Sequence, residues 1–530
     1  MTDATHSPSR AFVLGLDGVP WPLIRDWIAD DELPNFGRLV DEGAAGSLES
    51  TIQATTPLAW PAIATGTSPD KHGIYGFRKL TSSYTPQMYT SGDLCRPTLW
   101  DILSPSLVGN VPMTYPAQHL DGKLFTGMVT PELDDQFSYP SDLRDELEAR
   151  VPDYEIGLDW NDYAGREEAL FDDITDLVRK RREAMRLLME TEDWRLFFFV
   201  YTAPDRLQHL IWDESVLLEH YRQLDDILGE VLDYVQRLGA TLYVVSDHGF
   251  GPVSQFVAIN GVLEDAGLLA RGEESGTQSM FSSLGLSRDR VTELLSAVGV
   301  SGRAIVETVP EPLLRRVGKQ LPGDDVLFDV DHAETRMFGH DFGSLYVNDT
   351  DRFVDGTVDS SERESVKATA KATLSDVTDP VTGEPALTVH DGDDLFPTDD
   401  QSPDLVVEGK PEYETVTTLT DDVFTDTGTK AASHRSDGIV LAWGPNIEAG
   451  STPDDATVYD VAPTLLHHLG EPVPANADGR VLSEIFEPGS DPAERDPEST
   501  VYESHGAGET TEDEDFDNVK ERLSGLGYIE

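Results

Sequence analysis

The sequence has almost no cysteine and comparatively few basic residues. Its single cysteine, Cys95, excludes an intramolecular disulfide and a thiolate metal cluster, so any bound metal ion must be held by histidine and carboxylate side chains. Lysine and arginine together number 39 against 99 aspartate and glutamate residues, which leaves a formal net charge of −60 over 530 residues. Such a surface repels nucleic acid and anionic lipid, because both bind basic patches, and we expect neither as a partner.

Long apolar runs are also missing. No stretch approaches the roughly 18 residues needed to span a membrane. The polar segment Met1 to Arg10 is followed by the apolar run Ala11 to Leu16, which is too short for a secretion signal. The sequence therefore predicts a cytoplasmic protein that does not bind membranes.

The acidic excess extends along the whole chain instead of lying in one tail. This distribution favours a folded protein adapted to high salt, where a Debye length of about 3 Å screens the repulsion between carboxylates. We expect a halophilic, archaeal source. An ordinary acidic enzyme is the alternative.

Apolar strand-like runs alternate with helix-like segments through most of the chain. Apolar residues recur at helical spacing in Glu168 to Glu190 and in Val216 to Leu238. The apolar runs Leu196 to Tyr201 and Leu242 to Val245 follow these two segments. This order predicts an α/β fold with a mostly parallel central sheet and helices on both faces. In such sheets, ligands bind beyond the carboxyl ends of the strands.

The same alternation divides the chain into three parts. We expect residues 11–269 and 335–485 to form a single catalytic domain. Residues 270–334 change to short helical pieces with Gly and Ser breaks, which indicates a helical insertion that could cap the site. Residues 486–530 are rich in Pro, Asp, Glu and Ser, and predict an acidic C-terminal tail with little core of its own.

Two smaller segments carry their own predictions. Asp349 to Pro403 is acidic, and we expect a helix over Ser361 to Leu374 with surface loops around it. Within the tail, Val519 to Ile529 predicts a short helix that docks on the rest of the protein. The oligomeric state cannot be read from the sequence.

Side chains that can bind a metal ion stand beside the predicted strands. Six are found there: Asp17, Asp205, His209, Asp247, His248 and His434. Asp205 and His209 are four residues apart at the start of a helix, so both face the same way. If the strands are neighbours, the six ligands meet at one edge of the sheet, which is enough for two metal ions. Singly, each has a simpler explanation as a cap, turn or loop residue, so the combination carries the prediction.

Imidazole and carboxylate ligands suit Zn²⁺ or Mn²⁺ better than Mg²⁺ or Ca²⁺. A nucleophile should lie close to such ions, and the stretch from Thr55 to Gly66 supplies two threonines at its start, Thr55 and Thr56. A threonine hydroxyl is a poor nucleophile at pH 7 unless a metal ion lowers its pKa. At a helix N-terminus it would also lie beside N–H groups that bind phosphoryl oxygens. Either threonine could instead be an ordinary N-cap.

A series of short motifs runs through the chain in a fixed order. They are Asp17-Gly18, Thr56 ten residues before Gly66, Pro69 with His72-Gly73-Ile74, Pro204-Asp205 with His209, Ser246-Asp247-His248-Gly249, and His434. In this order they resemble the motifs of the alkaline phosphatase superfamily, and most closely those of its type I phosphodiesterase/nucleotide pyrophosphatase family. The resemblance runs from about Ala11 to Arg480, and no motif covers Ala270 to Glu334.

The resemblance implies a role for each matching residue. Asp205, His209 and His434 would hold one divalent ion, and Asp17, Asp247 and His248 would hold a second together with Thr56. Thr56 would be the nucleophile and would form a phospho-threonine intermediate. The implied enzyme hydrolyses a phosphodiester or phosphoanhydride bond of a small phosphorylated substrate with two ions, expected to be Zn²⁺ with Mn²⁺ as the other candidate.

One position departs from the family pattern. Five residues after His72, where the nucleotide pyrophosphatase branch has a phosphate-binding asparagine, this chain has Phe77, which cannot donate a hydrogen bond. Arg78 and Lys79 are nearby substitutes for binding the phosphate. Asn110 and Tyr115, in a cluster that follows a predicted helix, are further candidates for lining the substrate pocket, although a plain strand and turn would also explain them.

Three other functions remain open at this stage. A phosphomonoesterase or phosphomutase on the same scaffold is the closest alternative. A sulfatase is disfavoured, because Cys95-Arg96-Pro97-Thr98-Leu99 lacks the arginine of the C-x-P-x-R motif and lies far from the nucleophile position. A catalytically silent binding protein predicts gaps in the ligand set, and the sequence has none.

Overall fold

A large mixed sheet forms the centre of the computed structural model, which describes residues 9–158, 163, 166–272, 330–503 and 516–525. Its eight strands are, in spatial order, β2 (Ala44–Glu49), β19 (Asp437–Trp443), β9 (Thr241–Val245), β1 (Ala11–Leu16), β8 (Leu196–Tyr201), β5 (Ser106–Val111), β6 (Gly122–Thr126) and β7 (Ser138–Tyr139). The five strands from β9 to β6 run parallel. β7 is antiparallel to β6, β19 to β9, and β2 to β19. The predicted, mostly parallel sheet is confirmed.

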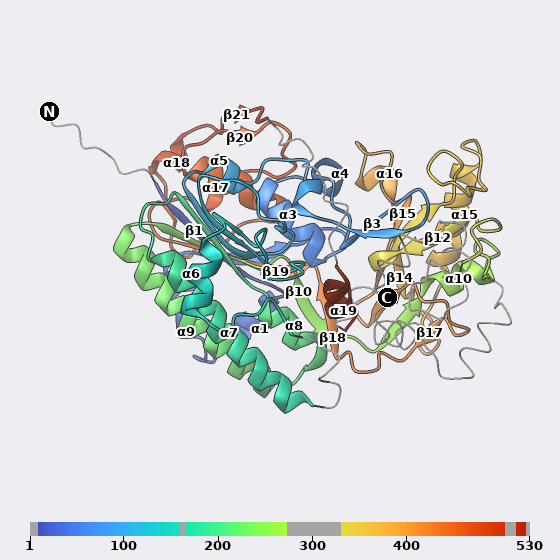
Figure 1. Cartoon of the computed structure of the whole chain (residues 1–530), viewed down its shortest axis with the longest axis horizontal. Coiled ribbons are helices and arrows are strands. Elements are labelled where there is room, and N and C mark those ends of the chain that lie inside the picture. The colour runs from blue at the N-terminus through green and yellow to red at the C-terminus, as the bar shows by residue number, and fades with distance from the viewer. Residues whose placement is uncertain (1–8, 159–162, 164–165, 273–329, 504–515, 526–530) are drawn as a thin grey trace.

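Helices cover both faces of this sheet, as the alternation predicts (Figure 1). Along β1, Phe12 and Leu14 join the core on one face and Val13 joins the core on the other. The first face is covered by α1 (Trp21–Ala29), α2 (Pro34–Glu42), α7 (Glu167–Met189) and α9 (Glu214–Leu238). The second is covered by α3 (Thr56–Thr65), α5 (Leu99–Ile102) and α17 (Val461–His468).

The boundaries of α9 show how local chemistry refines the apolar pattern. The helix begins before its first apolar residue because the side chain of Asp213 accepts hydrogen bonds from the N–H groups of Ser215 and Val216. It ends at Gly239, which adopts the left-handed conformation that favours glycine. Apart from these ends, α7 and α9 lie where the sequence predicts helices.

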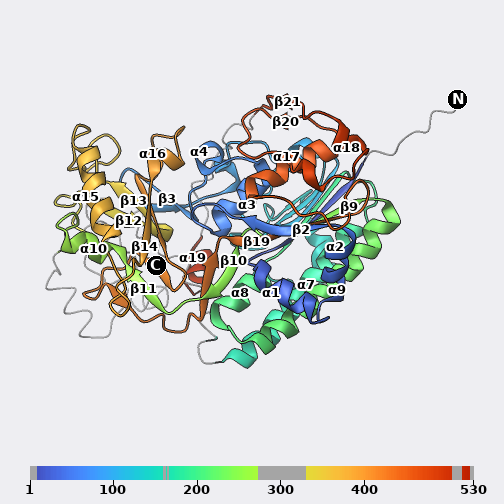
Figure 2. The same cartoon turned by 180° about the vertical axis from the view of Figure 1, so that it is seen from behind.

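A smaller lobe with its own hydrophobic core lies beside the large sheet (Figure 2). Its antiparallel sheet contains β12 (Met337–His340), β13 (Ser344–Val347), β15 (Leu405–Gly409) and β14 (Leu387–Asp391). A second sheet joins β16 (Tyr413–Val416), β11 (Gln255–Ala258) and β17 (Phe424–Thr425), and two helices, α10 (Ile259–Asp265) and α15 (Arg363–Ser375), pack on these strands.

The sequence analysis predicts α15 but not this lobe. The expectation of surface loops around that helix is wrong at β14, which pairs with β15 over its whole length. β14 escapes prediction because it is short and only its first residue, Leu387, is buried, so it lacks an apolar run.

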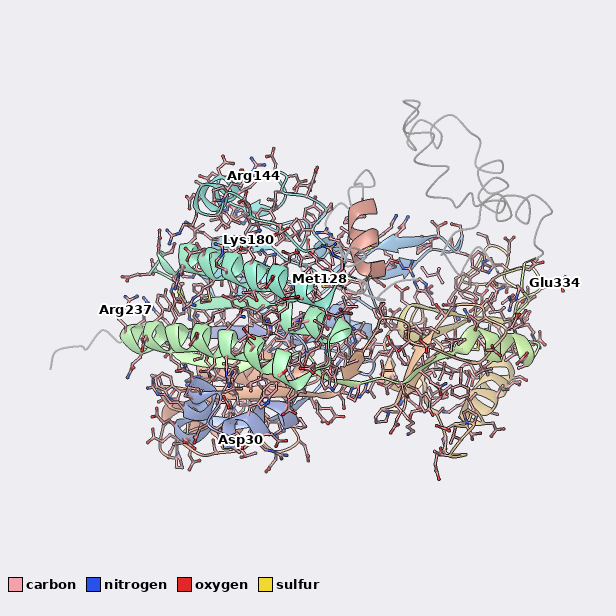
Figure 3. The ribbon with its side chains drawn as sticks, turned by 90° about the horizontal axis from the view of Figure 1, so that it is seen from below. Asp30, Met128, Arg144, Lys180, Arg237 and Glu334 are labelled. Atoms are coloured by element: carbon pink, nitrogen blue, oxygen red, sulfur yellow. The ribbon has the colours of Figure 1, made fainter. Side chains whose placement is uncertain are left out.

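The C-terminal region contacts the main body at several points. α18 (Asp491–Glu494) is followed by β21 (Ser499–Thr500), which pairs with β20 (Val473–Pro474). α19 (Asp517–Gly525) begins two residues before the predicted docking helix and overlaps it, and its Val519 and Leu523 are buried in the core cluster that includes Met128 (Figure 3). Most of the predicted insertion, 273–329, lies outside the described residues. Among the described helices, none is both long and apolar enough to cross a bilayer.

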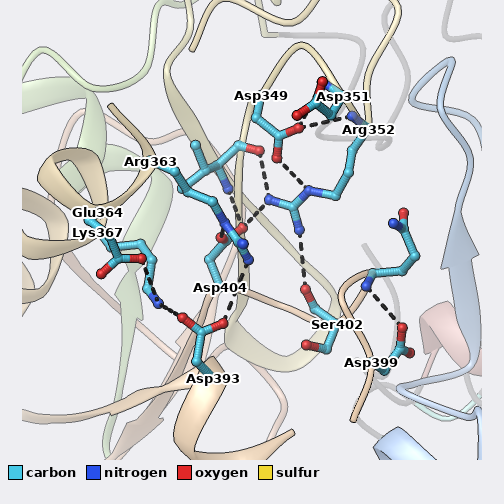
Figure 4. A network of polar contacts seen from close by, with 12 residues as sticks. Asp349, Asp351, Arg352, Arg363, Glu364, Lys367, Asp393, Asp399, Ser402 and Asp404 are labelled. Atoms are coloured by element: carbon cyan, nitrogen blue, oxygen red, sulfur yellow. Dashed lines mark hydrogen bonds and ion pairs between the residues drawn. The ribbon is translucent and has the colours of Figure 1, made fainter. Parts of the chain in front are cut away.

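A buried ion-pair network ties the smaller lobe together (Figure 4). The fully buried carboxylate of Asp404 accepts hydrogen bonds from the Arg352 guanidinium, from Nε of Arg363 at 2.6 Å and from the backbone N–H of Val347 at 2.7 Å. Asp349 Oδ2 accepts a second bond from Arg352, at 2.5 Å. The network therefore pairs the buried carboxylate of Asp404 with the nearly buried guanidinium of Arg352 and the partly buried one of Arg363, which offsets the cost of removing these charges from water.

We expect Asp404→Asn to lower the free energy of unfolding by about 3–5 kcal/mol, because it leaves the nearly buried guanidinium of Arg352 and the partly buried one of Arg363 facing a neutral amide. Asp393→Asn is the matched control, since Asp393 pairs with Lys367 in the same network but is 56% exposed, and we expect a loss below about 1 kcal/mol. Denaturant titration of the three proteins at one salt concentration measures both effects. Equal losses in the two variants would contradict this account.

His220 of α9 predicts an acid-sensitive contribution to stability. It is fully buried, its ring nitrogens have no hydrogen-bond partner among the described residues, and burial lowers its pKa to about 4. The unfolded chain, with a pKa of about 6.5, takes up this proton first. The contribution of neutral His220 to the free energy of unfolding is therefore fully present above about pH 6.5 and is lost as the pH falls towards 4.

For His220→Leu we expect this acid-dependent loss to disappear. The wild type should lose about 2 kcal/mol more of its free energy of unfolding than the variant between pH 8 and pH 5, measured by denaturant titration at both pH values. The exposed His119→Leu serves as the control. Parallel pH profiles for wild type and His220→Leu would show that His220 does not contribute.

Candidate metal centre

Polar side chains gather where three adjacent strands of the large sheet end. Asp17 directly follows β1, Asp205 lies on α8 (Ala203–Leu210) after β8, and Asp247 and His248 follow β9. Because β1 pairs with β8 on one side and with β9 on the other, their carboxyl ends lie next to one another. All four side chains are buried. The parallel register thus places three carboxylates within one small region.

Asp17, Asp247 and His248 form the first potential ligand group. One ligand atom of each lies within 4.8 Å of the others. Nε2 of His248 is 3.6 Å from Oδ1 of Asp17 and 3.3 Å from Oδ2 of Asp247. Nδ1 of His248 lies 3.0 Å from the carbonyl oxygen of Gly249, and since a carbonyl only accepts, Nδ1 carries the proton. Nε2 is therefore left with the lone pair that a metal ion requires.

Asp205, His248 and His434 form a second group with the same spacing. His434 lies on β18 (Ala432–Arg435), which pairs with β10 (Gly249–Pro252) so that the chain returns to the centre. Nε2 of His434 is 3.3 Å from Oδ1 of Asp205 and 3.2 Å from Nε2 of His209. Nε2 of His209 in turn lies 3.5 Å from Oδ1 of Asp205. All six predicted ligands thus come together, with His248 between the two groups.

Thr56 occupies the first turn of α3 at the edge of the first group. Its Oγ1 lies 3.4 Å from Oδ1 of Asp17 and 3.4 Å from Nε2 of His248. Because Thr56 is the first residue of α3, the N-terminus of this helix lies at the centre, where its dipole favours negative charge. The hydroxyl of Thr55 is also buried but has no hydrogen-bond partner among the described residues. The geometry therefore distinguishes Thr56 from Thr55, which local sequence reasoning leaves equivalent and between which the family resemblance favours Thr56.

The pKa values of the three carboxyl groups in this centre lie far from their usual range. Burial raises the pKa of Asp17, and the nearby carboxylates of Asp247 and Asp205 raise it further. Burial together with Asp205 likewise raises the pKa of Asp247. Burial also acts to raise the pKa of Asp205, but His209 and His434 outweigh it and hold that pKa well below its usual range. The cluster therefore holds more negative charge than its own residues neutralise.

This donor set fits divalent cations. Oδ2 of Asp247 is buried without a hydrogen-bond partner among the described residues, which is costly unless an ion fills that role. Mixed nitrogen and carboxylate donors suit Zn²⁺ and Mn²⁺. The residues present thus agree with the chemistry that the sequence predicts for them.

Several backbone and side-chain contacts hold the ligands in place. The N–H of Gly18 donates to Oδ1 of Asp247 at 3.2 Å, and the N–H of Val19 donates to Oγ of Ser246 at 2.8 Å. Gln208 Nε2 donates to the carbonyl of Gly18 at 2.7 Å. Sequence reasoning assigns no role to Gln208, although its position between Asp205 and His209 on α8 could have suggested one. Gly18 itself adopts a positive φ of 72°, which favours glycine at this turn.

The predicted substrate-binding residues have other partners in this structure. Phe77 is fully buried in the core beside the ring of Phe342. The guanidinium of Arg78 binds Asp341, with Nε 3.1 Å from Oδ1, and Nζ of Lys79 lies 2.5 Å from Oδ1 of Asp93.

Asn110 and Tyr115 also make internal hydrogen bonds. Nδ2 of Asn110 donates to the carbonyl of Val200 at 2.7 Å, and the hydroxyl of Tyr115 donates to Asp134 at 3.0 Å. A role of these five side chains in substrate binding therefore remains a prediction.

Comparison with known proteins identifies one family. The protein-family model described as type I phosphodiesterase / nucleotide pyrophosphatase matches residues 11–438 of this sequence, a range that contains all six predicted ligands and Thr56. No curated protein matches the chain. Similar solved structures include human ectonucleotide pyrophosphatase / phosphodiesterase 5, with a TM-score of 0.49 at 12% identity over 87% of this chain and 95% of that one. Another is its inactive murine counterpart in complex with AMP, with a TM-score of 0.48 at 12% identity over 88% and 96%.

We expect a divalent cation to stabilise this protein, because the buried carboxylates repel one another without one. At 100 times the dissociation constant the gain should be about 2.7 kcal/mol per ion. The measurement is calorimetric unfolding of chelator-treated protein with and without added Zn²⁺ or Mn²⁺. Asp247→Asn should show a smaller gain, whereas Asp233→Asn, an exposed acidic position on α9, controls for loose binding of cations to the acidic surface. Equal gains in both variants would place the ion elsewhere.

Proposed function

Because this chain belongs to the type I phosphodiesterase / nucleotide pyrophosphatase family, and is a hydrolase of that kind, we propose that it cleaves phosphodiester or phosphoanhydride bonds in small phosphorylated substrates with Thr56 as nucleophile. The observation that carries this proposal is the position of the Thr56 hydroxyl, 3.4 Å from both Asp17 and His248 at the N-terminus of α3.

Two divalent ions are part of the proposal. Asp205, His209 and His434 would hold one, and Asp17, Asp247 and His248, with Thr56, would hold the other, with Zn²⁺ favoured and Mn²⁺ possible. The group Asp205, His248 and His434 also satisfies the spacing, so His248 could serve either ion. Such a pair of ions, when bound, supplies Lewis acidity that activates hydroxyl groups and stabilises charge on phosphoryl oxygens.

The residues of the chain account for the remaining steps. Asp17 and His248 orient the Thr56 hydroxyl toward the phosphorus atom, and the N-terminal end of α3 favours the negative charge of the phosphoryl group. A bond forms between Thr56 Oγ and phosphorus while the bond to the leaving oxygen breaks, and the leaving group departs with a proton. Water then attacks the phospho-threonine, which releases the phosphoryl product and restores the Thr56 hydroxyl.

A phosphomonoesterase or phosphomutase is retained as the second candidate because of one observation. Phe77, at the position where the resemblance leads us to expect a phosphate-binding asparagine, is fully buried in the core and offers no hydrogen bond to a phosphate. The contacts that separate diesters from monoesters must therefore come from other residues. Turnover of bis(p-nitrophenyl) phosphate compared with p-nitrophenyl phosphate distinguishes the two candidates.

We expect Thr56→Ala to fold normally and to lose more than about 10³-fold in kcat on both esters, as removal of a nucleophile does. Thr55→Ala is the matched control, because it removes a neighbouring buried hydroxyl that makes no side-chain cap, and it should retain turnover. Steady-state rates with Zn²⁺ or Mn²⁺, together with intact mass after a rapid quench, measure turnover and phosphorylated enzyme. Undiminished turnover of Thr56→Ala would remove that residue from its role.

A further inference from the structure

Asp17 and Asp247, two of the three carboxylates that face His248, are held in the same manner. In each, one oxygen points toward His248, at 3.3 Å for Asp247 and at 3.6 Å for Asp17. The other oxygen accepts an N–H from a different part of the chain. For Asp247 this donor is the backbone of Gly18, and for Asp17 it is the indole Nε1 of Trp60, at 3.2 Å. Each carboxylate is therefore fixed at one oxygen and presents the other to the centre.

Trp60 approaches Asp17 from the same helix as the nucleophile. It lies four residues after Thr56 on α3, so both side chains lie on one face of the helix. Thr56 contacts Oδ1 of Asp17 at 3.4 Å while Trp60 donates to Oδ2. The first two turns of α3 thereby engage both oxygens of a single carboxylate.

The sequence of β1 makes room for this indole. A Cβ atom at Gly15 would lie only 2.4 Å from Cη2 of Trp60 and 2.8 Å from Cγ2 of Val200, so another residue there would displace the ring. The ring is fully buried and meets Phe198 edge to face, with centroids 6.2 Å apart. The position of the indole is thus set from two sides by packing, and its N–H has a fixed direction.

We infer that Trp60 is a positioning residue of the metal centre, whose indole N–H fixes the Asp17 carboxylate so that Oδ1 is presented to the ion and to Thr56. Without the N–H, the carboxylate can rotate about its terminal torsion and must be reoriented when an ion binds. Donors of this kind behind a ligand typically change metal affinity 10- to 100-fold. The inference rests on the proposed function, because it assumes that Asp17 is a ligand.

The test compares Trp60→Phe with Trp100→Phe. Phenylalanine keeps an aromatic ring at position 60 but removes the donor. Trp100 of α5 is the matched control, because it is also buried and meets the same Phe198 edge to face at 5.7 Å. Calorimetric titration of chelator-treated full-length protein with Zn²⁺ or Mn²⁺, without substrate, measures the affinity. We expect a 10- to 100-fold weaker affinity in Trp60→Phe and an unchanged affinity in Trp100→Phe, with similar losses of thermal stability.

A second substitution covers the case in which Trp60→Phe does not fold. Incorporation of 3-benzothienylalanine at position 60 keeps the shape of the bicyclic ring and replaces N–H by sulfur, and it should weaken the affinity to the same extent. Wild-type affinity in either folded variant, or equal weakening in Trp100→Phe, would overturn the role of Trp60 alone. Wild-type protein that binds no divalent ion would overturn the proposed function and this inference together.

Discussion

The concentration of buried negative charge at one edge of the sheet is the constraint on which the rest of the site depends. Asp17, Asp205 and Asp247 lie within a few ångströms of His248, far from water, and burial raises the pKa of two of them. Carboxylates so placed are stable only if they are protonated or neutralised by cations. His209 and His434 partly neutralise Asp205, whereas among the described residues His248 is the one basic side chain beside Asp17 and Asp247. The fold therefore requires positive charge at the place where Thr56, the candidate nucleophile, lies.

The register of the parallel sheet brings these carboxylates together. β1 is the central strand of three, so the residue that follows it lies between the residues that follow β8 and β9. An antiparallel neighbour would carry its following residue to the opposite edge. His434, the sixth ligand, reaches the centre in a different way, because it precedes β19 along the chain. The antiparallel pair β10–β18 returns it to the centre by placing His434 opposite Phe250.

The sequence predicts the long elements well and the fine geometry poorly, for physical reasons. α7 and α9 are predictable because their apolar residues recur at helical spacing and are buried on one face of the sheet, and β8 and β9 because their apolar runs are buried on both faces. His434 lies in no such pattern, and only the order of motifs identifies it. The position of Trp60 against Asp17 depends on the space above Gly15, which no residue pattern along a single chain encodes. Whether His248 shares an ion with Asp205 depends on side-chain rotation, which sequence spacing does not specify either.

The junction between the two lobes explains why substrate preference is the least predictable property. The segment that follows α3 and α4 (Pro69–His72) binds the smaller lobe: Arg78 pairs with Asp341, and the hydroxyl of Tyr75 donates to Asp399 at 2.7 Å. Phe77 packs on Phe342 at the same junction. The position that the family resemblance assigns to phosphate binding is thus used here for packing between lobes. The strands that position Asp17, Asp205 and Asp247 lie outside the smaller lobe, so the motifs that identify the metal ligands carry no information about how this lobe would contact a substrate.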